Sequence, residues 1–169
     1  MSLILIGGGA RSGKSRPALQ VARHHGSRLA FIATATASDD EMRDRIAVHR
    51  YERGPEFTTF EEPLAVRALI EAQASRFQAI VIDCLTLWLN NLLFATPDVS
   101  EEQCRRLVDA AASAPVPVIL VTNEVGCGIV PENALARHFR DAAGKLNQQA
   151  AEAATEVTWM VFGIPLKVK

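Results

Sequence analysis

The residues best suited to chemistry lie near the start of the chain, where positions 8–15 read Gly-Gly-Ala-Arg-Ser-Gly-Lys-Ser. A glycine, four residues and then Gly-Lys-Ser is the spacing of a phosphate-binding loop, whose main-chain N–H groups point at phosphate oxygens. In this pattern Lys14 reaches the outer phosphates and the Ser15 hydroxyl holds Mg²⁺. The candidate nucleotide-binding residues are therefore Gly8, Gly9, Ala10, Arg11, Ser12, Gly13, Lys14 and Ser15.

Such a loop needs a strand before it and a helix after it, and the sequence supplies both. The apolar run Leu3–Ile6 leads into the loop, and the helix-compatible stretch Arg16–His25 follows it. A helix start adds unpaired N–H groups and the positive end of the helix dipole to a phosphate site. Pro17 falls in the first helical turn, where its missing N–H costs little. A glycine-rich turn that fits the pattern by chance is the alternative.

Short apolar strands alternate with helical stretches along the rest of the chain. Runs of Ile and Val with little polar alternation are typical of strands buried on both faces, which helices then cover. The sequence therefore predicts an α/β fold with a mostly parallel sheet. The expected strands are Leu3–Gly7, Leu29–Thr34, Phe57–Glu61, Ala79–Asp83, Val118–Thr122 and Val157–Phe162, with a last strand, Leu166–Lys169, forming a C-terminal hairpin after residues 163–165.

Composition limits the function classes. With 169 residues, 49% hydrophobic content and 22% charged content, we expect one domain over residues 1–169 with a sizeable core. A net charge of −1 argues against a broad nucleic-acid surface. No apolar run approaches the roughly 20 residues of a membrane span, and Gly7 cuts short any secretory leader. Three cysteines without a Cys-x-x-Cys pair favour a reduced, cytoplasmic setting.

Asp83 ends the predicted strand Ala79–Asp83. A carboxylate at the carboxyl end of a parallel strand can contact the Mg²⁺ of a phosphate-binding loop, directly or through water. Asp83 could also cap a helix over Leu85–Phe94, and the two roles are compatible. We expect Ser15 and Asp83 to be the metal-binding residues.

His49 shares one face of a predicted helix, Asp39–Arg53, with Met42, Ile46 and Arg53. A histidine at this spacing is usually structural, so the spacing only permits a chemical role. An imidazole with the ordinary pKa of about 6.5 is largely neutral at pH 7 and can attack phosphorus without a separate base. Arg53, one turn further on, could reach the same phosphate.

Two other segments could contact a ligand. Glu61 and Glu62 could bind a base or a sugar, or stay solvated. The segment Thr122–Asn133 leaves a buried strand at the sheet edge where α/β proteins bind ligands, although a tight connection is the alternative.

The last long helix, from Ala134 to about Ala154 with Asn133 as its cap, is expected to have two faces. Its apolar stripe is interpreted as core packing and comprises Leu135, Phe139, Ala142, Leu146 and Ala150. Its basic residues are interpreted as a solvated face and comprise Arg137, His138, Arg140 and Lys145.

Together these segments resemble the bifunctional adenosylcobinamide kinase / adenosylcobinamide-phosphate guanylyltransferase family along essentially the whole chain. The most specific stretch is Val121–Asn133, read together with the loop at 8–15 and the segment around His49. The other landmarks are Ile32–Thr34, Asp40–Met42, Glu61–Pro63, Asp83–Thr86, Phe139–Asp141 and Gly163–Ile164. One departure is Cys127, where the family more often has a larger apolar residue.

The resemblance implies a RecA-like P-loop NTPase fold and two reactions at one nucleotide site. ATP or GTP phosphorylates adenosylcobinamide, and GMP is then transferred from GTP to the phosphate, giving adenosylcobinamide-GDP. It implies that His49 becomes guanylylated, with Lys14 and Arg53 as further catalytic residues, Mg²⁺ as cofactor and a homotrimer as the assembly. It extends the nucleotide contacts to Ala33, Thr34, Ala35, Tyr51, Glu52, Arg53, Gly54, Glu62 and Asp83.

Two other functions remain open at this point. A P-loop kinase for another small metabolite would share Lys14, Ser15 and Asp83 but would need no histidine nucleophile. A nucleotide sensor without enzymatic activity would bind GTP and make no product.

Overall fold

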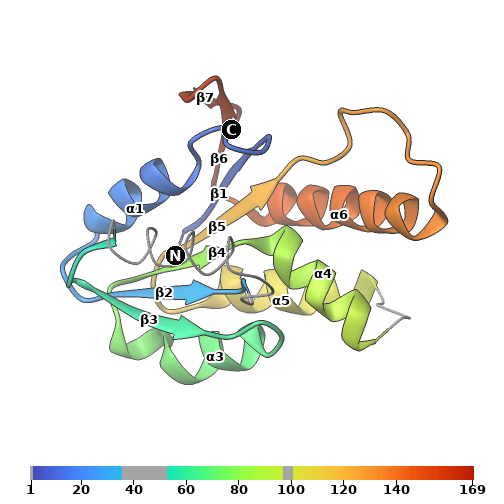
Figure 1. Cartoon of the computed structure of the whole chain (residues 1–169). Coiled ribbons are helices and arrows are strands. Elements are labelled where there is room, and N and C mark those ends of the chain that lie inside the picture. Colours follow the sequence, from blue (N-terminus) through green and yellow to red (C-terminus); the bar gives the residue numbers. More distant parts are fainter. Residues whose placement is uncertain (1, 36–52, 97–100) are drawn as a thin grey trace.

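The computed structural model describes residues 2–35, 53–96 and 101–169, which build a seven-stranded sheet with helices on both faces (Figure 1). The order across the sheet is β3-β2-β4-β5-β1-β6-β7. The first six strands in this order are parallel, and β7 runs antiparallel to β6. The strands are β1 (Leu3–Gly8), β2 (Leu29–Ala33), β3 (Phe57–Glu61), β4 (Ala79–Asp83), β5 (Val118–Asn123), β6 (Glu156–Val161) and β7 (Ile164–Lys167).

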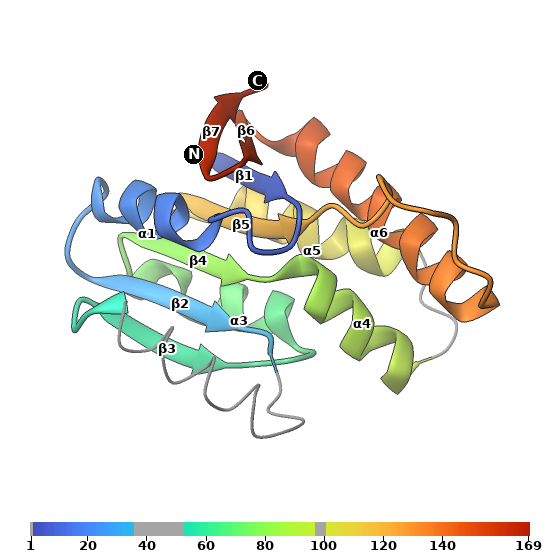
Figure 2. The same cartoon turned by 45° about the horizontal axis from the view of Figure 1, so that its top comes forward.

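Helices connect the parallel strands and lie on both faces of the sheet (Figures 1 and 2). They are α1 (Ser15–Arg23), α3 (Val66–Gln73) with a short 3₁₀ turn η1 (Ala74–Arg76), α4 (Leu85–Ala95), α5 (Glu101–Ser113) and α6 (Ala134–Ala153). Within the described ranges, none of these helices is long and apolar enough to span a bilayer.

The core has two parts, one on each face of the sheet. Along β1, Ile4 and Ile6 face the α1 side, whereas Leu3 and Leu5 face the side of α3, α4, α5 and α6. All six residues of β1 are buried. Burial on both faces explains why the strand sequences lack polar alternation. The predicted α/β fold and its mostly parallel sheet are confirmed.

The predicted strands are present, and their ends agree or differ by one residue, except in the last strand, where both ends lie two residues earlier than predicted. The C-terminal hairpin is confirmed, but the expected turn at 163–165 is wrong. Phe162 and Gly163 both adopt positive φ, 51° and 81°, so two residues reverse the chain and β7 begins at Ile164. Such a tight turn matches the right-handed twist of paired strands.

The helix predictions differ in outcome. Asn133 caps α6, because its Oδ1 accepts a hydrogen bond from the Ala136 N–H at 3.1 Å. The apolar stripe of α6 packs in the core at Leu146 and Ala150, but Leu135 is 57% exposed, so core packing is wrong for the first turn. The predicted helix Asp39–Arg53 lies outside the described residues except at Arg53.

Helix α3 was not among the expected helices. Its N-cap residue, Ala65, has no side chain that could cap it. Instead the Glu62 carboxylate accepts hydrogen bonds from the N–H groups of Leu64 and Ala65, at 2.9 and 2.7 Å. Because the capping group lies three residues before the N-cap, the usual sequence signal of a helix start is missing.

Candidate active site

The loop at 8–15 leaves β1 between its two neighbours in the sheet. Gly8 is paired with Asn123 of β5 on one side and with Met160 of β6 on the other. Gly8 has a φ of 154°, and a Cβ there would lie 2.7 Å from the Ser12 Oγ and 2.9 Å from the Met160 carbonyl oxygen. The first glycine of the motif is therefore required by the space around it as well as by its backbone conformation.

Lys14 points back into the loop. It is 8% exposed, and its Nζ donates to the Gly9 carbonyl at 2.6 Å and to the Ser12 Oγ at 3.3 Å. Burial lowers the pKa of Lys14, while Cys84 and Asp83 act in the opposite direction. The amine thus sits among oxygen acceptors at the place where a phosphate-binding loop holds its phosphates.

Ser15 and Asp83 meet across the sheet edge. The Ser15 Oγ donates to the Asp83 Oδ2 at 3.3 Å. The expected N-cap role of Asp83 is wrong, because Cys84 occupies the N-cap position of α4. A hydroxyl and a carboxylate are the hard oxygen donors that Mg²⁺ takes in nucleotide sites, so these residues fit the ion.

Around these residues lies a cavity of about 580 Å³. Ten of the predicted site residues line it: Ala10, Arg11, Ser12, Gly13, Lys14, Ser15, Ala33, Ala35, Arg53 and Asp83. Asn123 also lines the cavity and belongs to the segment Thr122–Asn133, which was expected to leave the sheet at a ligand-binding edge. Five further lining residues were not predicted as site residues: Arg16, Phe31, Cys84, Leu87 and Val121. The structure thus brings the loop, the ends of β2, β4 and β5, and Arg53 around one space.

Arg53 is held against Phe31. The residue is 4% exposed, and its guanidinium carbon lies 4.1 Å from the centroid of the Phe31 ring. The Arg53 carbonyl also accepts a hydrogen bond from Arg23 at 2.9 Å. Stacking of this kind holds a guanidinium in one orientation. The predicted site residues His49, Tyr51 and Glu52 lie outside the described part of the chain.

Three predicted nucleotide-binding residues are hydrogen-bonded to, or closely packed against, other parts of the chain. The Thr34 hydroxyl is buried and bridges the main chain of Cys84, with its Oγ1 2.7 Å from the N and 2.9 Å from the O. Gly54 has a φ of 80°, and a Cβ there would lie 2.5 Å from the Glu56 Oε2. Glu62 caps α3, as described above. None of the three is among the residues that line the cavity.

Cys84, Thr86 and Asn123 form a polar cluster. The Cys84 Sγ lies 2.8 Å from the Thr86 Oγ1, and both residues are buried. Burial raises the pKa of the Cys84 thiol, so it stays protonated at neutral pH and is a poor nucleophile. A polar residue at the end of an apolar strand, as at Asn123, is the sequence signal that could have found this cluster.

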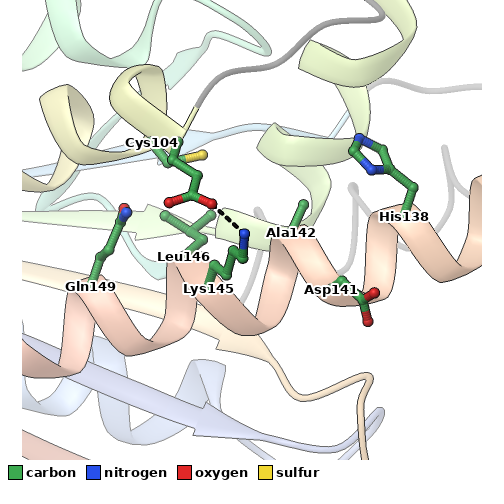
Figure 3. Close-up of a pocket in the computed structure, with 8 residues that line it drawn as sticks. Cys104, His138, Asp141, Ala142, Lys145, Leu146 and Gln149 are labelled. Atoms are coloured by element: carbon green, nitrogen blue, oxygen red, sulfur yellow. Dashed lines mark hydrogen bonds and ion pairs between the residues drawn. The ribbon is translucent and has the colours of Figure 1, made fainter.

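A second, smaller cavity of about 150 Å³ lies between α5 and α6 (Figure 3). Lys145 reaches across it to Glu101 of α5 and forms an ion pair with it. Arg137, nearer the start of α6, donates to the carbonyls of Pro131 and Glu132 at 3.0 and 2.6 Å. These two members of the expected solvated basic face therefore also hold α6 to its neighbours.

Comparison with known proteins places the chain in a family. Residues 4–168 match the family described as "Cobinamide kinase / cobinamide phosphate guanyltransferase". The chain belongs to this family. It is 44% identical to the bifunctional adenosylcobalamin biosynthesis protein CobP of Pseudomonas aeruginosa, over 98% of this chain and 96% of the relative. It is 42% identical to CobU of Escherichia coli, over 99% of both chains.

Membership of the cobinamide kinase / cobinamide phosphate guanyltransferase family makes the chain an enzyme with kinase and guanylyltransferase activity. Solved structures of lower sequence identity agree on the fold. The RadB recombinase has a TM-score of 0.56 at 18% identity, with 94% of this chain and 73% of that chain covered. A type III secretion ATPase has a TM-score of 0.57 at 12% identity, with 98% and 56% covered. The fold is that of the RecA-like P-loop NTPases, as predicted.

Proposed function

We propose that this chain, acting as one domain over residues 1–169, phosphorylates adenosylcobinamide and then transfers GMP from GTP to the resulting phosphate. The observation that carries the proposal is the meeting of Ser15 and Asp83 at 3.3 Å, in the cavity that Lys14 also lines. The family match over residues 4–168 supplies the two reaction types. The relatives' names place both in adenosylcobalamin biosynthesis.

In the kinase step, the substrate hydroxyl oxygen attacks the γ-phosphorus of ATP or GTP. The bond from that phosphorus to the bridging oxygen breaks, and the nucleoside diphosphate leaves. The loop N–H groups and the Lys14 amine stabilise the charge that develops on the phosphates, because they are already oriented before the reaction. Ser15 and Asp83 would hold Mg²⁺, which when bound offsets part of the phosphate charge.

In the guanylyl step, a neutral His49 imidazole nitrogen attacks the α-phosphorus of GTP. The bond to the oxygen that bridges to the β-phosphorus breaks, and pyrophosphate leaves. The phosphate oxygen of adenosylcobinamide phosphate then attacks the same phosphorus, and the P–N bond breaks. Arg53, which stacks on Phe31 and lines the cavity, would hold the α-phosphate in both half-steps.

We further propose a homotrimer in the cytoplasm. Large apolar side chains of the β6–β7 hairpin support a contact between subunits, since Phe162 is 96% and Ile164 68% exposed. Ile129, in the loop after β5, is also almost fully exposed. Light scattering of the purified protein tests the assembly, and three chains per particle is the expected result.

Two labels in GTP test the reactions. With α-labelled GTP alone, the protein should retain acid-labile label and release pyrophosphate. With γ-labelled GTP and adenosylcobinamide, the label should appear on the corrinoid. Product formation without any retained label would overturn the covalent step, and transfer of the γ-label alone would favour a simple kinase. Bound nucleotide without any corrinoid product would indicate a sensor.

A further inference from the structure

Asn123, the last residue of β5, lines the nucleotide cavity and has no role in the mechanism above. It is paired with Gly8, the residue that begins the phosphate-binding loop, and the next N–H, that of Glu124, donates to the Gly8 carbonyl at 3.1 Å. On its other side β5 pairs with β4, which ends at Asp83. Asn123 therefore lies at the cavity edge between the loop and the expected metal carboxylate.

The orientation of the Asn123 side chain is fixed by contacts on its nitrogen. The Nδ2 donates to the Thr86 Oγ1 at 3.1 Å and approaches the Cys84 Sγ at 3.5 Å. The residue's main chain is also held, because the Asn147 Nδ2 of α6 donates to the Asn123 carbonyl at 3.2 Å. With the nitrogen engaged by the protein, the Oδ1 is the end of the amide that can accept a hydrogen bond from a ligand.

Asn123 and Lys14 line the same cavity. The Lys14 amine, which reaches the outer phosphates in such loops, is bonded to the carbonyl of Gly9, the residue after Asn123's partner Gly8. A hydroxyl that attacks the γ-phosphorus in line approaches from beyond the outer phosphate, opposite the leaving oxygen, so a residue near Lys14 can contact it.

The chemistry of the kinase step calls for an acceptor at this place rather than a strong base. Among the described residues that line the cavity, Asp83 is the only carboxylate, and the mechanism uses it for the metal. Phosphoryl transfer passes through a loose transition state, so catalysis depends on positioning and charge stabilisation more than on early removal of the proton. A neutral carbonyl oxygen is sufficient to orient a hydroxyl.

Resting on the proposed function, we propose that Asn123 positions the acceptor hydroxyl of the kinase step. Its Oδ1 accepts a hydrogen bond from the hydroxyl and directs an oxygen lone pair toward the γ-phosphorus. As the new P–O bond forms and the nucleoside diphosphate leaves, the hydroxyl proton passes to water. The guanylyl step uses a phosphate oxygen that carries no proton, so it does not need this contact.

The test measures the two reactions separately in the Asn123→Ala variant. The kinase step is followed with γ-labelled GTP and adenosylcobinamide, and guanylyl transfer with α-labelled GTP and preformed adenosylcobinamide phosphate. We expect kcat of the kinase step to fall by about 10²-fold with the KM for nucleotide little changed, as for a misplaced reacting group. Guanylyl transfer should change by less than about 3-fold.

Two further variants separate positioning from folding. Thr86→Val keeps the Asn123 oxygen but removes a contact that orients it, so it should give a smaller loss, of about 10-fold, in the kinase step alone. Gln148→Ala, an exposed amide on α6, should leave both reactions unchanged. Equal losses in both reactions, or no loss in either, would overturn the role of Asn123. A wild-type protein that forms no product would instead contradict the proposed function.

Discussion

The Ser15 hydroxyl donates a hydrogen bond to the Asp83 carboxylate, although 68 residues separate the two in the sequence. The contact joins the first turn of α1 to the carboxyl end of β4. It follows from the strand order β4-β5-β1, which leaves a single strand between β4, which ends at Asp83, and β1, which leads into the loop before Ser15. A cation held here would lie next to the phosphates that the loop binds.

Asp83→Asn is expected to weaken Mg²⁺ binding in both reactions, since it replaces a charged oxygen ligand with a neutral one. The Mg²⁺ concentration for half-maximal rate should rise at least about tenfold, which corresponds to about 1.4 kcal/mol. Initial rates across a Mg²⁺ series measure this. Asp109→Asn makes the same charge change at an exposed position of α5 and should leave the series unchanged. An unchanged series for Asp83→Asn would contradict its role as a ligand.

Lys14→Ala is expected to impair both reactions, because one amine serves the single nucleotide site. Loss of one oriented donor typically lowers the rate by about 10²- to 10³-fold. Rates with γ-labelled and α-labelled GTP measure the two steps. Arg105→Ala, which removes a positive charge at an exposed position of α5, is the control. Full activity of Lys14→Ala in either step would rule out the single-site mechanism.

His49→Ala should abolish GMP transfer and leave at least part of the kinase activity, because only the guanylyl step passes through a bond to histidine. Retained α-label after denaturation and γ-label on the corrinoid are the two readouts. His138→Ala, on the exposed side of α6, should keep both. If His49→Ala still becomes labelled from α-labelled GTP, another residue is the nucleophile.

Gly8→Ala and Gly9→Ala form a matched pair within the loop. A Cβ at Gly8 meets the Ser12 Oγ and the Met160 carbonyl, whereas a Cβ at Gly9 has no neighbour within 4 Å. Strain of about 2 kcal/mol at Gly8 would lower Tm by roughly 4–8 °C in a chain of this length, with weaker nucleotide binding. Gly9→Ala should shift Tm by less than about 2 °C. Calorimetry and nucleotide titration measure both, and equal shifts would show that crowding at Gly8 is not decisive.

The three cysteines should differ in reactivity. Burial raises the pKa of Cys104 to about 11, and it also raises the pKa of Cys84, whereas Cys127 is exposed. At pH 8 only about one Cys104 thiol in a thousand is ionised. This fraction increases about tenfold for each unit by which the pH is raised, until the pH approaches the pKa. Alkylation of the native protein followed by mass spectrometry should therefore modify Cys127 first. Equal modification of Cys104 at pH 8 would contradict this order.

Much of the fold was predictable because local patterns and tertiary structure agree in this chain. Continuous apolar runs mark β1, β4 and β5, since helices cover both faces of each strand. The predicted position of the β6–β7 turn was wrong because the turn depends on a positive φ at Phe162. Phenylalanine rarely adopts this conformation, so the sequence gives no signal for it. Helix α3 was missed because Glu62 caps it from outside the usual position.

The site was only partly predictable for a similar reason. A motif identifies residues that are consecutive, so Ala10–Ser15 were found, and all of them line the cavity. Phe31 and Val121 lie on other strands and come to the site through the strand order, which no local spacing encodes. Thr34 and Glu62 were also predicted as nucleotide contacts, and the structure shows that their polar groups form hydrogen bonds with the main chain.

The sequence by itself determined the phosphate-binding loop, the alternation of strands and helices, and the resemblance to a family. Each of these can be recognised from the types and spacing of residues that are close together in the chain. The sequence also paired Ser15 with Asp83 as metal-binding residues, and the structure brings them together. Only the tertiary structure decided that Arg53 lies on Phe31 and that Asn123 is oriented by Thr86. The physical reason is that a parallel sheet gathers the ends of its strands at one edge, in an order fixed by packing and not by position along the chain.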